Sequence, residues 1–191
     1  MMRHGLLVLF ACLCLAGCGA ATAFYMQGSS AFAAGDYDRA AQAFSLALVE
    51  NPQHIGALTA LGITHYRQGA FDAAVDVLER AQALAPDDPR IRLYRALADL
   101  RQGQLDQARQ HLAAFLELNQ NRSLAEQTLR ALTVLEEPTL PGSIGEYVAD
   151  SLEAAFQQEQ RVRALRQRVR ALEAQRQLAT YPLLFRGPRV R

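Results

Sequence analysis

The sequence predicts an all-α protein: a solenoid of about three helix-turn-helix repeats with a capping helix, followed by a long C-terminal helix with short coiled-coil character. The first observation is a set of residue types that returns every 34 positions between Phe24 and Leu112. Glycine and proline punctuate that stretch and divide it into segments of about a dozen residues. The third observation is a heptad pattern in residues 161–172.

The 34-residue period holds over three copies, although Arg92 and Arg95 make the third copy diverge. Self-similarity at a fixed period of this length indicates stacked supersecondary units. The recurring sets are Gly28, Gly62 and Ala96; Gly35, Gly69 and Gly103; Tyr37, Phe71 and Leu105; Ala40, Ala74 and Ala108; Phe44, Leu78 and Leu112; Ala47 and Ala81; and Pro52 and Pro86.

The spacing predicts two helices in each copy. Gly28 lies on the first helix where the second helix crosses, so the two backbones can approach closely. Gly35 ends the first helix, because glycine accepts a left-handed conformation. Pro52 follows the second helix and discourages its continuation. One such pair cannot bury its apolar face alone, so stacking must supply the core.

This pattern resembles the tetratricopeptide (TPR) repeat, which implies binding of a protein or peptide along the concave surface formed by the first helices. Aromatic and aliphatic side chains with interspersed arginine there suit an extended peptide or an amphipathic helix. The chain's own C-terminal helix is the alternative occupant. The residues that the resemblance places in this groove are Tyr25, Ser29, Phe32, Thr59, Ile63, Tyr66, Arg67, Arg90, Leu93, Leu97, Leu100 and Arg101.

The N-terminus has the form of an export signal. Residues 1–17 contain Arg3 and then an apolar run that is too short to span a membrane. They lead into Leu15-Ala16-Gly17-Cys18, which resembles the lipobox of bacterial lipoproteins. The resemblance implies cleavage before Cys18 and attachment of acyl chains such as palmitate, which anchor the protein to a lipid bilayer. Residues 18–21 form the lipidated end and a short tether.

Gly19 follows the lipidated cysteine, where many Gram-negative lipoproteins retained in the inner membrane have aspartate. The resemblance therefore favours the outer membrane, on its periplasmic face. A mature chain from Cys18 onward keeps only that cysteine, so it has no disulfide.

Residues 22–136 are predicted to form the TPR domain with its capping helix. Ser123-Leu124-Ala125-Glu126 has the form of a capping box that opens the last helix of this domain. Arrays of repeats need such a helix to cover their last exposed face. Residues 137–142 contain two prolines and a glycine, which predicts a linker.

The long helix is predicted over residues 143–180, and 181–191 form a flexible basic tail. Its heptad core consists of Val162, Leu165, Val169 and Leu172, a pairing typical of two-stranded coiled coils. A weak homodimer, an acidic partner helix through residues 144–179 and a fold-back onto the repeats are all left open. Charge segregates along the chain, with −8 over residues 19–160 and +8 over residues 161–191.

No motif supports catalysis, a cofactor or a metal site. His54, His65 and His111 lie in separate units without metal-ligand spacing, and no phosphate-binding loop is present. Nucleic acid is an unsuitable partner for an exported lipoprotein. The sequence therefore predicts a membrane-anchored scaffold or assembly adaptor for another envelope protein or peptide. The alternative is an accessory lipoprotein of a periplasmic signalling system, acting through the arginine-rich helix.

Overall fold

The computed structural model describes residues 19–137 and 141–180, with side chains up to residue 177. The predicted signal peptide, Cys18 and the tail from residue 181 lie outside the described residues. All regular secondary structure in the described ranges is helical, which confirms the all-α prediction. No helix in these ranges is long and apolar enough to cross a membrane.

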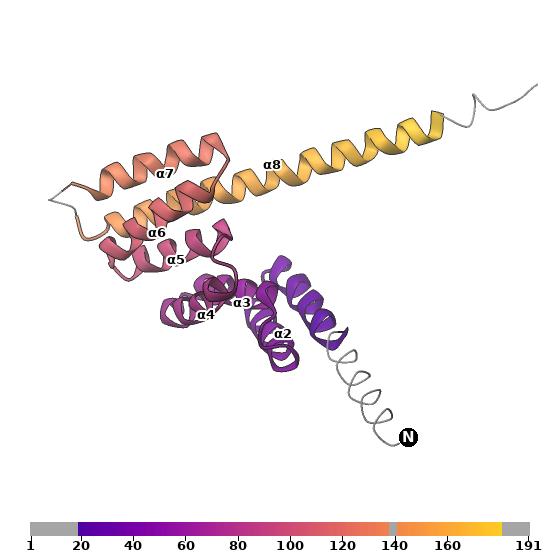
Figure 1. The fold of residues 1–191 in the computed structure, drawn as a ribbon, viewed down its shortest axis with the longest axis horizontal. Coiled ribbons are helices and arrows are strands. Elements are labelled where there is room, and N and C mark those ends of the chain that lie inside the picture. The colour runs from indigo at the N-terminus through magenta and orange to yellow at the C-terminus, as the bar shows by residue number, and fades with distance from the viewer. Residues whose placement is uncertain (1–18, 138–140, 181–191) are drawn as a thin grey trace, which may run out of the picture.

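Consecutive helices pack in pairs, and the pairs stack (Figure 1). The first helix is described over residues 19–33. The others are α2 (Tyr37–Glu50), α3 (Ile55–Arg67), α4 (Phe71–Leu84), α5 (Pro89–Arg101), α6 (Leu105–Leu118), α7 (Arg122–Leu135) and α8 (Ile144–Thr180).

The first helix of each repeat ends in the same way. Gly35, Gly69 and Gly103 have φ angles of 80°, 76° and 73°, in the left-handed region that favours glycine. The amide after each glycine donates to a carbonyl five residues earlier, as in Asp36 to Ala31 at 3.0 Å. This hydrogen bond defines the Schellman motif, and it confirms the role predicted for Gly35.

The predicted close approach of helices occurs at two glycines. A Cβ atom added to Gly28 would lie 2.6 Å from the ring of Phe44 in α2. A Cβ added to Gly62 would lie 2.5 Å from Cγ of Leu78 in α4. Each large side chain therefore fills the space that glycine leaves, which explains why both positions recur together every 34 residues.

A periodic hydrogen bond also joins neighbouring repeats. The Gln68 side chain donates to Asp38 at 2.7 Å, and 34 residues later Gln102 donates to Asp72 at 2.5 Å. The next acidic residue in this series, Asp106, pairs instead with Arg109 of its own helix. The repeating contact therefore stops at α6, where regular stacking ends.

Side-chain caps fix the beginnings of four helices. Asp36 caps α2, Asp88 caps α5, and Nδ1 of His54 accepts from the amide of Ala57 at 3.0 Å to cap α3. The capping box predicted at residues 123–126 is wrong. The α7 helix begins at Arg122, and Asn121 is its cap, because the Asn121 side chain accepts from the Leu124 amide at 2.9 Å.

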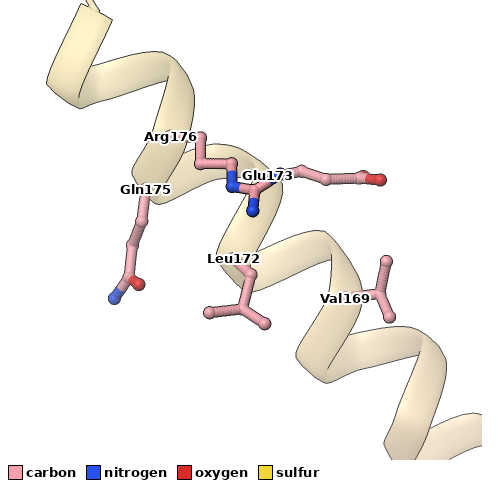
Figure 2. A pocket seen from close by; sticks show the side chains of 5 residues that line it. All are labelled: Val169, Leu172, Glu173, Gln175 and Arg176. Carbon is pink, nitrogen blue, oxygen red and sulfur yellow. The ribbon is translucent and has the colours of Figure 1, made fainter.

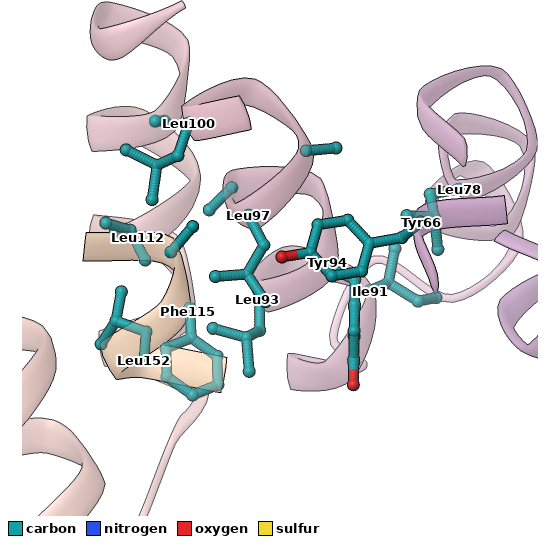
Figure 3. Packing of buried hydrophobic residues seen from close by; sticks show 14 of the residues in the cluster. Tyr66, Leu78, Ile91, Leu93, Tyr94, Leu97, Leu100, Leu112, Phe115 and Leu152 are labelled. Atoms are coloured by element: carbon teal, nitrogen blue, oxygen red, sulfur yellow. The ribbon is translucent and has the colours of Figure 1, made fainter. Parts of the chain in front are cut away.

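The last four helices close a ring of contacts, in which α8 packs against both α5 and α7. Leu152 of α8 lies among Leu93 and Leu97 of α5 and Leu112 and Phe115 of α6, and all five are buried (Figure 3). The sequence predicts that α7 alone caps the last face of the array. In the structure, α7 and the first four turns of α8 share this role.

A buried carboxyl group lies inside the α5–α6 pair. Asp99 is fully buried, and neither carboxyl oxygen has a hydrogen-bond partner. Burial raises its pKa to about 6, against an opposing effect of the Arg95 charge. Nε2 of His111 lies 3.7 Å from Asp99 Oδ2, and burial, with the charges of Arg95 and Arg92, lowers the pKa of His111 to about 4.

These two groups are expected to give opposite dependences of stability on pH. The folded state holds the Asp99 proton more tightly than the unfolded chain, so this group adds stability as the pH falls from 6 towards 3.8. The folded state resists protonation of His111, so that group removes stability as the pH falls from 6.5 towards 4. The two effects therefore oppose each other in the native chain.

Single substitutions should expose each dependence. Relative to the native chain, His111→Gln should become more stable, and Asp99→Asn less stable, as the pH is lowered from 7 to 4.5. Urea unfolding at several pH values measures both. Parallel pH curves for the two variants and the native chain would contradict this account of the buried pair.

Candidate protein-binding groove

The predicted groove residues fall into an open group and a covered group. Tyr25, Ser29 and Phe32 from the first helix and Ile63 from α3 are all partly exposed. They form the N-terminal end of the concave surface. Thr59, also on α3, is buried and does not contribute an accessible surface.

The C-terminal end of the groove is covered. Leu93 and Leu97 are fully buried and Leu100 is 1% exposed, because α8 packs along this face of α5. The prediction that these three leucines contact a partner is therefore corrected. The alternative occupant, the chain's own C-terminal helix, takes that place.

Polar contacts hold α8 in the groove. Arg67 Nη1 lies 2.6 Å from Glu153 Oε1, and the Tyr66 hydroxyl donates to Glu153 Oε2 at 3.2 Å. Arg101 Nη2 donates to Asp150 at 2.5 Å, and its Nε donates to the Tyr66 oxygen at 3.3 Å. Glu153 is only 8% exposed, so its carboxylate is stabilised by Arg67 and Tyr66 and not by water.

Tyr66 is the centre of this arrangement. It is 4% exposed and packs edge-on against Tyr94, which in turn packs edge-on against Phe156 of α8. Burial raises the pKa of Tyr66 to about 12, so the hydroxyl keeps its proton for the hydrogen bond to Glu153. The remaining predicted residue, Arg90, pairs with Asp88, the cap of its own helix, at 2.7 Å.

Glycine allows α8 to approach the backbone of α5. A Cβ added to Gly145 would lie 2.5 Å from the carbonyl oxygen of Leu100. Ala149 follows one turn later and is fully buried. Small residues at these positions let the two helices lie close enough for Val148 and Leu152 to reach the core.

A small apolar hollow remains at the open end. It has a volume of about 140 Å³ and lies between the first helix, α2 and α3. Its lining residues are Ser29, Phe32, Phe44, Ala60 and Ile63. A hollow of this size and polarity suits one apolar side chain of a bound peptide.

The described residues hold no group of three or more His, Cys, Asp or Glu side chains placed to bind a metal ion. The arrangement offers apolar packing, arginine charges and hydrogen bonds. These are the means of holding another polypeptide.

Glu153, Asp150 and Gly145 were not predicted as groove residues. Their signal was present in the sequence as a stripe of small and apolar residues on one face of α8, with acidic residues beside it. The stripe consists of Gly145, Val148, Ala149, Leu152 and Phe156.

The stacked helix pairs define a helical-repeat protein. Two tetratricopeptide repeat models match the sequence, over residues 25–89 and 66–132, which together make up more than half of the chain. The chain belongs to the tetratricopeptide repeat family. It is a protein-interaction scaffold of the TPR type.

Known proteins share parts of this sequence and fold. The Arabidopsis thaliana "Protein CTR9 homolog" is 32% identical over 94 residues, which are 49% of this chain but span only 9% of that protein. The Yersinia enterocolitica type III secretion chaperone SycD, solved with a peptide of the translocator YopD, has a TM-score of 0.57 and 20% identity, and the match covers 60% of this chain and 91% of that one.

The first TPR of Spaghetti (RPAP3), solved with the HSP90 peptide SRMEEVD, has a TM-score of 0.56 and 23% identity. The match covers 60% of this chain and 94% of that chain. At these identities, both structures establish the shared fold alone.

Proposed function

We propose that the protein is a membrane-anchored periplasmic adaptor that holds a peptide or helix of another envelope protein in the open end of its groove. The observation that carries this proposal is the apolar hollow between Phe32 and Ile63, beside a groove whose other end already holds a helix. Peptide complexes of the similar proteins SycD and RPAP3 support this reading.

The covered end of the groove suggests what the open end accepts. There, the bound helix contributes apolar residues to the repeats and carboxylates to Arg67 and Arg101. A partner with an apolar anchor suits the remaining hollow for the same physical reason as the apolar residues of α8 suit the covered end.

Ile63→Glu tests the open groove, because a charged side chain would line the hollow that an apolar anchor needs. The amount of partner captured by the full chain is expected to fall tenfold or more, because the new charge would be unpaired at an apolar contact. Val49→Glu is the matched control, since Val49 is 74% exposed on α2. Circular dichroism checks that both variants are folded. If they then capture equal amounts of partner, the groove does not bind it.

Anchoring is a separate part of the proposal and rests on Leu15-Ala16-Gly17-Cys18 and on Gly19. Cys18→Ala is expected to move the protein from the outer-membrane fraction to the soluble fraction of a Gram-negative host. Membrane association and acylation that persist in this variant would defeat the lipobox assignment. The alternative role, in a periplasmic signalling system, depends on the second half of α8.

A further inference from the structure

The second half of α8 leaves the domain as a single helix (Figure 1). Residues 161–177, defined here as the projecting half, are exposed except for Val162, which is partly buried. At 1.5 Å per residue, this segment extends roughly 25 Å from the repeat domain. An exposed helix of this length should be polar on all sides.

It instead carries an apolar stripe. Leu165, Val169 and Leu172 are 59%, 52% and 60% exposed, and with Val162 they form the predicted heptad seam. Shallow hollows lie along this stripe, and Figure 2 shows the side chains that line one of them, Val169 and Leu172 among them. At 3.6 residues per turn, the stripe lies roughly 135° around the helix from the face that packs on α5. It is therefore a separate surface and not an end of the packed face.

Arginine flanks the stripe on both sides. Arg161 and Arg168 lie on one side and Arg166 on the other, in the positions that set partner choice in coiled coils. No acidic side chain of the described chain pairs with any of these three arginines. The projecting half has a net charge of +5, whereas residues 144–160 of the same helix have −4.

A second copy of the chain is a poor occupant of this surface. In a parallel pair, Arg161 would face the partner's Arg166, and Arg168 would face the partner's Glu173. In an antiparallel pair, the side of the seam that carries Arg161 and Arg168 would face the same side of the partner, so arginine would meet arginine. Repulsion therefore offsets or exceeds attraction in both arrangements.

A lipid surface also fits less well than a helix. The stripe contains four aliphatic residues, and no aromatic residue occurs between Phe156 and Tyr181. Helices that lie in the membrane interface carry a broad apolar face, commonly with aromatic residues. Valine and leucine alternating at heptad spacing instead match the packing of one helix against another.

We propose that the projecting half of α8 is a docking surface for an acidic α-helix of another protein. The partner helix carries an aliphatic heptad seam flanked by Asp or Glu. Every flanking contact with Arg161, Arg166 and Arg168 is then attractive. This surface is separate from the groove and does not depend on what the groove binds.

Two synthetic three-heptad peptides test the proposal. Both have a Val/Leu seam, and the flanking residues are Glu in the acidic probe and Lys in the basic probe. Fluorescence anisotropy with the full chain should show the acidic probe bound about tenfold tighter or better, because several ion pairs act together. Arg161→Glu with Arg168→Glu should reverse that preference.

Leu165→Ser with Leu172→Ser should abolish binding of the acidic probe. Ala164→Ser with Ala171→Ser, on the opposite face, should leave it unchanged. Equal binding of the two probes, or binding that survives the leucine changes, would overturn the proposal. A dimer that needs these leucines would point to a second copy. Leucine-dependent binding to phosphatidylglycerol vesicles without probe binding would point to lipid, and either result would also overturn it.

Discussion

Leu152→Asp is expected to release the first half of α8 and to lower the free energy of unfolding by about 4 kcal/mol or more. Leu152 is 1% exposed and lies between the leucines of α5 and the side chains of Leu112 and Phe115 of α6. An aspartate there would bury a charge with no cationic partner. Releasing α8 restores water to the charge but exposes Leu93 and Leu97 of α5 instead.

Ala154→Asp is the control, because Ala154 is exposed on the same helix. It introduces the same charge and is expected to change stability by less than about 0.5 kcal/mol. Urea unfolding followed by circular dichroism measures both variants. Similar losses for the two would show that Leu152 is not buried against the repeats.

Gly145→Ala is expected to destabilise the protein by roughly 2–3 kcal/mol, although alanine is the better helix former. The added Cβ would lie 2.5 Å from the backbone carbonyl oxygen of Leu100. A backbone atom cannot rotate away as a side chain can, so α8 as a whole must move from α5. That movement weakens the packing of Val148 and Leu152.

Gly142→Ala provides the matched comparison. Nothing lies within 4 Å of a Cβ at Gly142, and its φ is not positive, so this change is expected to be neutral or slightly stabilising. Thermal unfolding of the two variants measures the difference between their melting temperatures. If Gly145→Ala melted at or above the temperature of Gly142→Ala, the close approach of α8 to α5 would not exist in solution.

The repeat units could be predicted from the sequence because local chemistry and helix packing repeat together. Gly35, Gly69 and Gly103 determine where the first helices end, and Gly28 with Phe44 determines how a pair crosses. The cap at His54 was less predictable, since histidine seldom takes that position. Its imidazole nitrogen accepts as a carboxylate would.

The covered end of the groove could not be predicted from repeat positions alone. Family resemblance marks Leu93, Leu97 and Leu100 as a binding surface, whether the occupant belongs to another chain or to this one. The decisive residues lie some 50 positions later in the sequence, at Glu153 and Gly145. The heptad pattern of residues 161–172 does not extend to the stripe that begins at Gly145, because the two stripes lie on different faces of α8. The heptads therefore gave no indication of the face that packs on α5.

The division of α8 also explains the segregation of charge. Its acidic half meets Arg67 and Arg101 of the repeats, and its basic half projects. The fold-back that the sequence left open would place the arginine-rich part of the C-terminal helix against the acidic repeat domain. In the structure, the acidic half of the helix makes the contact, so Arg161, Arg166 and Arg168 of the projecting half remain available to another molecule.

Amide hydrogen exchange of the full chain tests most directly whether α8 is half docked and half projecting. Amides of residues 148–156 should exchange as slowly as those of α5, because both should open only when the domain unfolds. Amides of residues 163–177 should exchange orders of magnitude faster, through local opening of an unsupported helix. A single exchange rate along the whole of α8 would contradict the account, whether that rate were fast or slow.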